Sequence, residues 1–308
     1  MRYRNLLLFV VLAAIWGSAF MAIKAGLDFF PPVLFAALRY DIAAVFMLAY
    51  AVYVTDHWLP RTREEWYLVI VGAVLLIAGY HIFLFIGETQ TTSAAAAVII
   101  SLSPILTTSF ARALLPSQRL TVAGVVGMVI ALVGVTILAR PDPANLLTED
   151  VVAKFLVFLA ALSFSFGSVL TRRIEADLPI ETMEAWSMLG GAVLMHAVSL
   201  ALPNESLGDV VWTNEGLLAL AYLSLVASAI GFLIYFDLLD RLGPVEINLV
   251  SYVAPIFAAL SGFLFLDEVI DVYTAAGFLV IFTGFLLLKG RDIHTELLGT
   301  TQSNETAE

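Results

Sequence analysis

Two ionisable side chains inside long apolar stretches are the first candidates for chemistry. Arg39 lies seven residues into the apolar stretch that begins at Pro32, and its rigid fork of donors suits a substrate carboxylate. An internal ion pair, or a hydrogen bond to a helix end, is the alternative. His81 would titrate near neutral pH and could couple a process to protons. A core histidine with both ring nitrogens bonded inside the protein is the alternative there.

Four aromatic side chains could form the walls of a pocket for a small molecule. Trp16, Tyr80, Trp186 and Tyr252 all stand in apolar stretches, and ligand pockets are mostly apolar with a few fixed polar groups. Ordinary packing between helices is the alternative. We predict that these four side chains contact a solute together with Arg39 and the neighbouring His81.

Two prolines stand within apolar stretches and share a helix face with polar residues. Pro104 follows Ser101 by three positions, and Pro255 follows Asn248 by seven and Tyr252 by three. A proline inside a helix removes one backbone donor and bends the helix. We therefore predict solute contact for Ser101, Asn248 and Tyr252, and a gating role for the two prolines; hydrogen bonding between helices is the alternative.

Several carboxylates lie near the ends of apolar stretches in the second half of the chain. Glu246 precedes the polar stripe of the second proline by two positions, and it is our candidate for a proton-coupled gate. Glu184 and Asp237, like Glu246, lie within one to three turns of the cytoplasmic boundary. The arginines near enough to pair with these carboxylates are Arg172, Arg173 and Arg241. A cluster of structural salt bridges is the prediction for Glu184 and Asp237 and the alternative for Glu246.

Several kinds of chemistry are excluded or disfavoured. The chain has no cysteine and four scattered histidines, so thiolate chemistry is excluded and the spacing of a metal site is missing. The P-loop pattern of an ATPase does not occur either. We predict no cofactor and no metal. An intramembrane enzyme stays open as an alternative, although an enzyme should present a clustered set of catalytic groups.

The composition indicates an integral membrane protein. Of 308 residues, 61% are hydrophobic and 13% are charged, whereas soluble proteins average about half apolar and about a quarter charged. The formal charge of −11 argues against a nucleic-acid partner, which requires clustered Lys and Arg. The lipid bilayer is the expected environment.

The apolar stretches predict ten spanning helices. Each is near the roughly 20 residues that cross about 30 Å of hydrocarbon, and a stretch such as 125–138 is apolar on every face, unlike a barrel strand. The predicted spans are residues 5–26, 32–54, 66–87, 92–115, 120–139, 152–171, 180–202, 214–236, 245–266 and 271–289.

The basic residues predict the orientation in the plasma membrane. With a cytoplasmic N-terminus, eleven of the fifteen Lys and Arg residues fall at the inner face and three at the outer face. Such a bias is typical of the cytoplasmic side. Both termini are therefore expected in the cytoplasm, and the polar stretch 291–308 is expected to be a disordered cytoplasmic tail.

The second half of the chain resembles the first half. Pro104 corresponds to Pro255 at an offset of 151, and Gly127 and Gly134 correspond to Gly277 and Gly284 at an offset of 150. The string LAAIWGSAF (12–20) resembles LAALSFSF (159–166). Five spans per copy is an odd number, so the second copy enters the membrane from the opposite side. Inverted repeats of this kind are common in secondary transporters.

Taken together, these motifs resemble the EamA branch of the drug/metabolite transporter superfamily. The resemblance covers about residues 5–290 and includes the Trp16–Gly17 pair, Arg39, the mid-helix prolines and a glycine-spaced closing helix. An acidic residue is often found in this family before the closing helix of each copy; Glu268 fits, but the first copy has Gln118. The resemblance implies export or exchange of small metabolites, amino-acid-like compounds above all.

We therefore expect an all-α membrane protein of two inverted five-helix repeats, residues 1–144 and 145–290. Its expected function is that of a secondary transporter, an exporter or exchanger of small organic solutes that works by alternating access. A membrane scaffold that transports nothing is an alternative. The small residues of the two closing helices predict close packing inside the chain and leave a homodimer across them as a further alternative.

Overall fold

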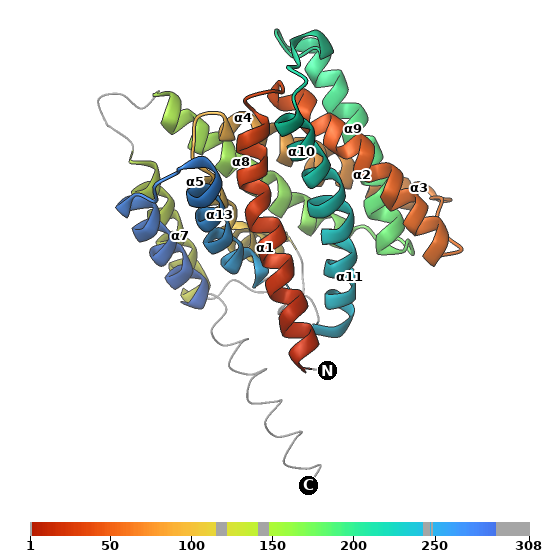
Figure 1. The fold of residues 1–308 in the computed structure, drawn as a ribbon. Coiled ribbons are helices and arrows are strands. Elements are labelled where there is room, and N and C mark those ends of the chain that lie inside the picture. The colour runs from red at the N-terminus through yellow and green to blue at the C-terminus, as the bar shows by residue number, and fades with distance from the viewer. Residues whose placement is uncertain (1, 115–121, 141–147, 243–246, 248, 288–308) are drawn as a thin grey trace.

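Helices make up the protein. The computed structural model describes residues 2–114, 122–140, 148–242, 247 and 249–287, and within these ranges the chain forms helices and turns without strands (Figure 1). Our predictions for Glu246, Asn248 and the tail 291–308 lie outside the described residues.

Six helical stretches of the described chain are long and apolar enough to cross a membrane. Several are built from more than one element, and α5 and α6 count together as one stretch. The elements are α1 (Arg2–Gly26), α2 (Pro32–Val54), α3 (Arg63–Val71) with η1 (Gly72–Gly79) and α4 (Tyr80–Glu88), α5 (Ser93–Ile100) with α6 (Ser103–Leu114), α8 (Glu149–Arg173), and α10 (Asn214–Ala221) with η3 (Tyr222–Ile230) and α11 (Gly231–Leu242).

The other helices are shorter or less apolar, and one further element, η2, is a 3₁₀ turn. They are α7 (Val122–Ala139), α9 (Ile180–Ala201), α13 (Val250–Leu266) and the last described helix, Val272–Leu287; η2 is Leu207–Asp209. The bounds of all these helices agree with the predicted stretches to within six residues. The protein is thus a multi-pass helical membrane protein, as the composition indicates.

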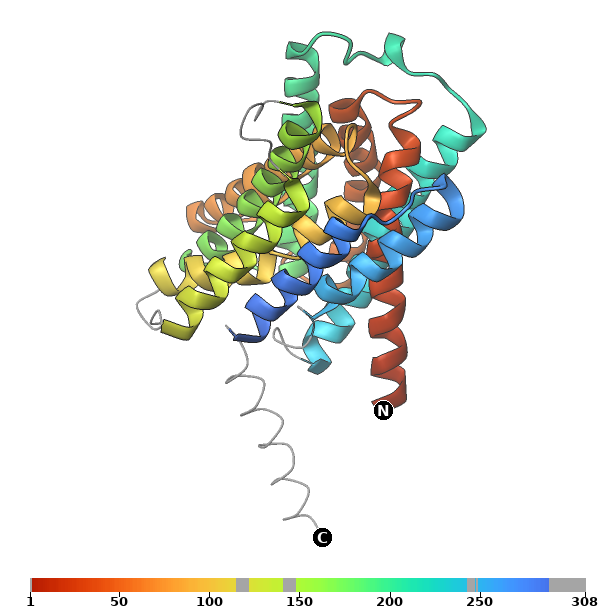
Figure 2. The same cartoon turned by 90° about the vertical axis from the view of Figure 1, so that its left-hand side faces the viewer.

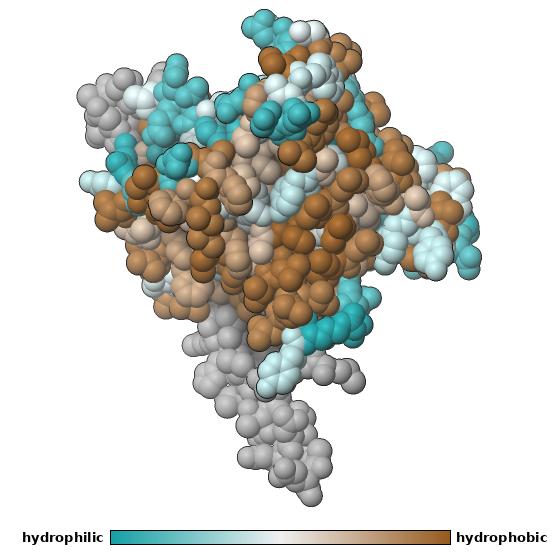
Figure 3. Space-filling view, in the orientation of Figure 1, coloured by the Kyte–Doolittle hydropathy of each residue, from teal (hydrophilic) through white to brown (hydrophobic). Residues whose placement is uncertain are grey.

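The outer surface of the bundle is apolar. Large side chains such as Phe263, Phe265 and Leu218 are more than half exposed, and Figure 3 shows a broad hydrophobic face with hydrophilic side chains gathered toward its edges. Exposed apolar area of this extent marks an interaction surface rather than a water-facing one. Lipid acyl chains are the neighbours that such a surface fits.

Contacts between the ends of helices define two opposite ends of the bundle. At one end, Lys24 near the end of α1 bonds to the end of α4, and Glu268 after α13 bonds to the start of α5. We call this the α4–α5 end. The start of α9 lies at the other end, where Trp186 Nε1 donates to the carbonyl oxygen of Trp58 at 2.8 Å. We call this the α8–α9 end.

Corresponding helices of the two halves pack in a corresponding way. Helix α1 packs on α13, while α8 packs on α5 and α6; η1 packs on α9, while η3 packs on α2. Helices α2 and α9 also pack on each other. For these pairs, the contact of a first-half helix thus has a counterpart made by a second-half helix.

Small residues bring α7 and the last helix into direct backbone contact. A Cβ added at Gly284 would lie 2.5 Å from the Gly127 carbonyl oxygen, and one added at Gly277 would lie 2.8 Å from that of Gly134. Both views show the two helices side by side (Figure 2). The prediction of close packing inside the chain is confirmed.

The two corresponding prolines have different surroundings. The predicted helix 92–115 is divided at Ser101 and Leu102, just before Pro104, whereas α13 continues through Pro255. The hydroxyls of Ser101 and Ser103 donate to the carbonyl oxygens of Val98 and Ile100 at 2.6 and 2.8 Å. These bonds satisfy carbonyls near the break, which the hydrocarbon region requires.

Candidate functional site

A cavity of about 480 Å³ lies between the two halves of the chain. Its lining comes from helices of both halves, among them α1, α2, α4, α8, α9, α11 and α13. At one extreme it includes the exposed residues Arg172 and Ile180 and half-buried residues between them, where α8 connects to α9. At the other extreme it includes the buried side chains of Arg39 and His81. The cavity therefore opens toward the α8–α9 end and extends into the interior of the bundle.

Arg39 is the buried cation of this cavity. Its side chain is 6% exposed, Nε donates to the hydroxyl of Ser228 at 3.1 Å, and its guanidinium carbon lies 5.2 Å from the centre of the Tyr40 ring. None of the ion pairs within the described part of the chain includes Arg39. An ionisable group inside a membrane usually faces protein or a water-filled cavity, and here the guanidinium can bind an anion in that cavity.

His81 lines the cavity beside Arg39 with both ring nitrogens bonded. Nδ1 lies 2.8 Å from the carbonyl oxygen of Ile77, and Nε2 lies 3.0 Å from the hydroxyl oxygen of Tyr40. A carbonyl oxygen only accepts, so Nδ1 carries the proton and Nε2 of the neutral ring accepts from Tyr40. His81 therefore orients Tyr40, and the arrangement matches the core-histidine alternative while leaving the ring at the cavity wall.

Trp16 forms a wall of the cavity through an aromatic cluster. Its ring centre lies 5.5 Å from that of Tyr235 and 5.9 Å from that of Phe232, and all three side chains line the cavity. Nε1 donates to the Ala227 carbonyl oxygen at 3.2 Å. A large apolar wall with a fixed donor is suited to holding the apolar part of a small molecule.

Two π-helical segments, η1 and η3, border the cavity at corresponding places. Ala227 in η3 accepts the bond from Trp16, and Leu75 in η1 accepts a bond of 2.8 Å from the hydroxyl of Ser163. Trp16 and Ser163 are equivalent in the alignment of residues 12–20 with 159–166. A π-helix alters the backbone ladder, often at functional sites, and here carbonyl oxygens of both segments accept a donor from a neighbouring helix.

The remaining predicted residues are divided between the cavity and helix contacts. Tyr80 lines the cavity. Ser101 belongs to the break before Pro104, and Trp186 is bound to the Trp58 carbonyl at the α8–α9 end. Tyr252 lies 4.2 Å, ring centre to ring centre, from Phe285 of the last helix. These three, Pro104 and Pro255 are not among the lining residues, and solute contact or gating by them stays a prediction.

Two carboxylates that looked alike in the sequence have different surroundings. Asp237 pairs with Arg241 at 2.8 Å and with Arg4 at 3.3 Å, as expected for a salt-bridge cluster. Glu184 instead lines the cavity and has no ion pair within 4.0 Å among the described residues. The carboxyl of Glu184 thus adds an acid to the same cavity as Arg39. The position of Glu184 within an apolar stretch was the sequence feature that could have indicated this role.

The α4–α5 end is closed by contacts between three parts of the chain. Lys24 Nζ donates to the carbonyl oxygens of Glu88 and Thr89 at 3.0 and 2.9 Å. Both carboxylate oxygens of Glu268 lie 3.1 Å from the backbone nitrogen of Ser93. These contacts join α1 and the residues after α13 to the α4–α5 connection, at the end opposite the cavity mouth.

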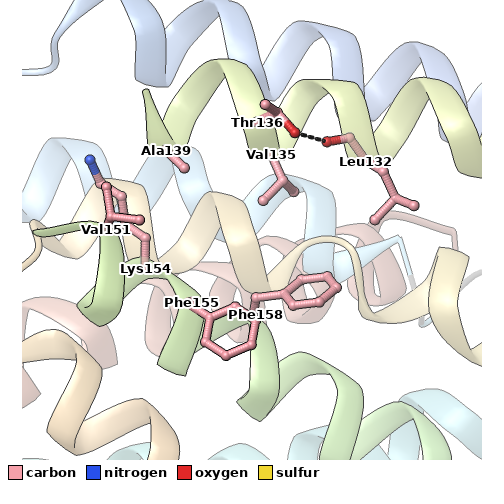
Figure 4. A pocket seen from close by; sticks show the side chains of 8 residues that line it. All are labelled: Leu132, Val135, Thr136, Ala139, Val151, Lys154, Phe155 and Phe158. Atoms are coloured by element: carbon pink, nitrogen blue, oxygen red, sulfur yellow. Dashed lines mark hydrogen bonds between the residues drawn. The ribbon is translucent and has the colours of Figure 1, made fainter. Parts of the chain in front are cut away.

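A second, smaller cavity of about 250 Å³ lies between α7 and α8. Figure 4 shows its eight residues, which are mainly apolar and include Phe155, Phe158 and Val135, with Lys154 toward one end. Lys154 pairs with Asp150 at 2.7 Å, and the Thr136 hydroxyl donates to the Leu132 carbonyl within its own helix. Because its polar groups are already engaged, this cavity is a weaker candidate site than the central one.

Comparisons with known proteins agree with the sequence resemblance. The model of the EamA-like transporter family matches residues 4–140 and 152–289. The chain is 30% identical over 267 residues to the "Uncharacterized inner membrane transporter YedA" of Escherichia coli strain K12, covering 85% of this chain and 84% of that one. It is 25% identical to the "Uncharacterized transporter YoaV" of Bacillus subtilis strain 168, covering 89% and 92% of the two chains.

A solved structure shares the architecture. One crystal structure matches with a TM-score of 0.64 at 25% sequence identity, and the match covers 94% of this chain and 98% of the other. The fold described here therefore exists in an experimentally determined protein.

Proposed function

The chain belongs to the EamA-like transporter family, and from that premise we propose that it is a secondary carrier of small organic metabolites. It works by alternating access, as an exporter or an exchanger, and amino-acid-like compounds are its main substrates. The names of its relatives indicate transport rather than an enzymatic reaction. A scaffold without transport and an intramembrane enzyme are the alternatives.

The central cavity is the observation that carries this proposal. It combines a buried guanidinium from Arg39, a carboxyl from Glu184 and the aromatic wall around Trp16. A compound with a carboxylate, an amino group and an apolar part would find a partner for each. The cavity opens at the α8–α9 end while contacts of Lys24 and Glu268 close the α4–α5 end, which is the arrangement of one state of an alternating-access cycle.

Two inverted repeats, residues 1–144 and 145–290, would supply the second state. Support comes from the corresponding helix contacts, from the corresponding π-helical segments and from the separate matches of the family model to residues 4–140 and 152–289. In transporters with inverted repeats, rocking of one repeat against the other moves access between the two sides. Five spanning helices in each repeat give both termini the same side, the cytoplasm according to the distribution of basic residues.

A binding screen followed by flux measurements tests the proposal. Purified protein in detergent would be heated with a panel of amino acids and related metabolites, because a ligand that binds the folded state raises the apparent unfolding temperature. Compounds that stabilise the protein would then be used, radiolabelled, for uptake into liposomes. We expect uptake of at least one such compound, and absence of uptake across the panel would contradict the proposal.

Two matched arginine variants distinguish loss of the cavity's cation from the general effect of removing an arginine. Arg39→Gln removes the buried cation of the cavity and should abolish uptake. Arg140→Gln removes an exposed arginine that pairs with Asp271 at the opposite end, and it should leave uptake near the wild-type rate. Equal uptake by both variants would mean that the solute binds elsewhere.

A further inference from the structure

The α4–α5 connection buries three polar side chains that have no hydrogen-bond partner among the described residues. They are Glu88, with neither carboxyl oxygen bonded, Thr91 and Ser93. Glu88 and Ser93 are 0% exposed and Thr91 is 5% exposed. Buried polar groups nearly always have partners, so a short segment with three exceptions calls for an explanation by function.

The charged neighbours of this segment bond to its backbone and leave the Glu88 carboxyl unpaired. The ammonium of Lys24 is 3.0 Å from the Glu88 carbonyl oxygen and 2.9 Å from that of Thr89, and the carboxylate of Glu268 caps the Ser93 nitrogen. No ion pair involving Glu88 occurs within the described part of the chain.

The charge state of Glu88 in this conformation follows from its surroundings. A buried carboxylate without a partner is costly, and such a group takes up a proton instead. The charges that face it are Lys24 from α1 and Arg39 from α2, which favour the ionised form, and Glu268 beyond α13, which opposes it; Tyr80 of its own helix is a further titratable neighbour. With no hydrogen bond from either cation to its carboxyl, the neutral form fits the closed end.

We propose that Glu88 is a proton-binding site that gates the α4–α5 end. Its carboxyl takes one proton from the solution on that side as the end closes, and it returns that proton to the same solution as the end opens. Once ionised, the carboxylate competes for the ammonium of Lys24 with the two carbonyl oxygens that Lys24 now holds. Losing those bonds releases α1 from α4, and the end opens.

This proposal rests on the alternating access proposed above and makes it dependent on protons. One proton leaves for each opening, so the ratio of open to closed protein rises by at most about tenfold for each unit of pH. Opening is favoured when the solution at the α4–α5 end becomes more alkaline. Acidification of that solution holds the end closed.

Accessibility of one introduced cysteine would test the gate without any knowledge of the solute. The native chain has no cysteine, so Ile23→Cys places a single thiol on the cavity wall beside Lys24, at a position that is 2% exposed. A membrane-impermeant maleimide is added to the side that the α4–α5 end faces. Because the thiolate fraction itself rises with pH, each labelling rate is divided by that of the unfolded protein at the same pH. Leu84→Cys, on α4 and also lining the cavity, provides a second reporter.

The Glu88 variants determine the outcome. With Glu88 intact, the corrected labelling rate should rise with pH by up to about tenfold per unit. In Glu88→Gln, a neutral side chain of the same shape, it should stay low at every pH. Glu205→Gln is the matched control because Glu205 is also buried at this end but binds the backbone nitrogens of Val33 and Leu34 at 3.1 and 2.8 Å; it should keep the pH dependence.

Two results would contradict the assignment of Glu88 as the proton-binding site. A pH-independent rate with Glu88 intact, or an unchanged pH dependence in Glu88→Gln, overturns the proposal. If Glu88→Gln does not fold, Glu88→Asp decides, since a shifted midpoint supports the assignment and an unshifted midpoint overturns it. A protein with a pH-dependent gate but no flux of any solute would contradict the carrier and leave the Glu88 site intact, whereas flux with a pH-independent gate would do the reverse.

Discussion

The contact between Trp16 and the π-helical segment η3 depends on the absence of a side chain at Gly231. A Cβ at this position would lie 2.8 Å from Trp16 Nε1 and 3.4 Å from its neighbouring ring carbon. The indole has little room to move because Nε1 bonds to Ala227 and the ring packs on Tyr235 and Phe232. Gly231→Ala therefore forces either strain or loss of this hydrogen bond.

The size of the effect follows from these contacts. Overpacking, or a carbonyl oxygen left without its donor, costs about 1–3 kcal/mol, and alanine recovers about 1 kcal/mol through its higher helix propensity. We expect the free energy of unfolding to fall by up to about 2 kcal/mol, measured by denaturant titration of the protein in detergent micelles. Gly208→Ala, in the short 3₁₀ turn η2, is the control. A Cβ at Gly208 would have its nearest contact 3.5 Å away, so a change within about 0.5 kcal/mol is expected.

A double-mutant cycle identifies the cause. If the clash with the indole is responsible, Gly231→Ala should be neutral or slightly stabilising when Trp16 is replaced by alanine, since contacting residues are not additive. An equal loss of stability in both backgrounds would refute this account of η3. The account would also be refuted if Gly231→Ala were more stable than the unmodified protein.

Three further changes have expected outcomes. Arg39→Lys keeps the charge but loses the planar fork, so the apparent affinity for carboxylate solutes in liposome uptake should fall about tenfold, equivalent to about 1.4 kcal/mol; unchanged affinity would remove Arg39 from the binding site. Glu205→Ala removes the carboxylate that caps the start of α2 and should lower the free energy of unfolding by about 1–2 kcal/mol in detergent titrations, whereas no loss would mean that the cap is unimportant. Gly284→Ala places a Cβ 2.5 Å from a carbonyl oxygen of α7 and should lower the unfolding temperature; a rise would contradict the described contact between these helices.

Much of the helical architecture could be predicted from the sequence because lipid imposes a length and an apolar composition on each span. The stretch 32–54 coincides with α2, and 180–202 differs from α9 by one residue. Small residues at the closing helices likewise predicted their packing, since a side chain at Gly134 or Gly284 would collide with backbone atoms of the neighbouring helix.

The features that depend on cross-helix contacts could not be predicted. The sequence around Pro104 and Pro255 is similar, yet a break occurs only before Pro104, where two serine hydroxyls satisfy carbonyl oxygens. The π-helical segments have no sequence pattern of their own, and the donors that bond to them, Trp16 and Ser163, come from helices distant in the chain.

The candidate site was predicted only in part, because some of its features also depend on contacts between helices that are distant in the chain. Trp16, Arg39, Tyr80 and His81 were selected by residue type and lie together in the cavity. Glu184 was assigned to a salt-bridge cluster because arginines are close in sequence. Glu88 was not selected from the sequence, because its burial and its lack of partners among the described residues are properties of the folded chain that no local pattern contains.

Counterflow in proteoliposomes tests most directly whether the central cavity is reached in turn from the two sides. Liposomes loaded with an unlabelled solute from the binding screen are diluted into a trace of the same solute carrying a radiolabel. Alternating access predicts transient accumulation of the label above equilibrium, saturation with increasing solute, and loss of both in Arg39→Gln. Label that only equilibrates at a rate proportional to concentration, and equally well in Arg39→Gln, would contradict a carrier built around this cavity.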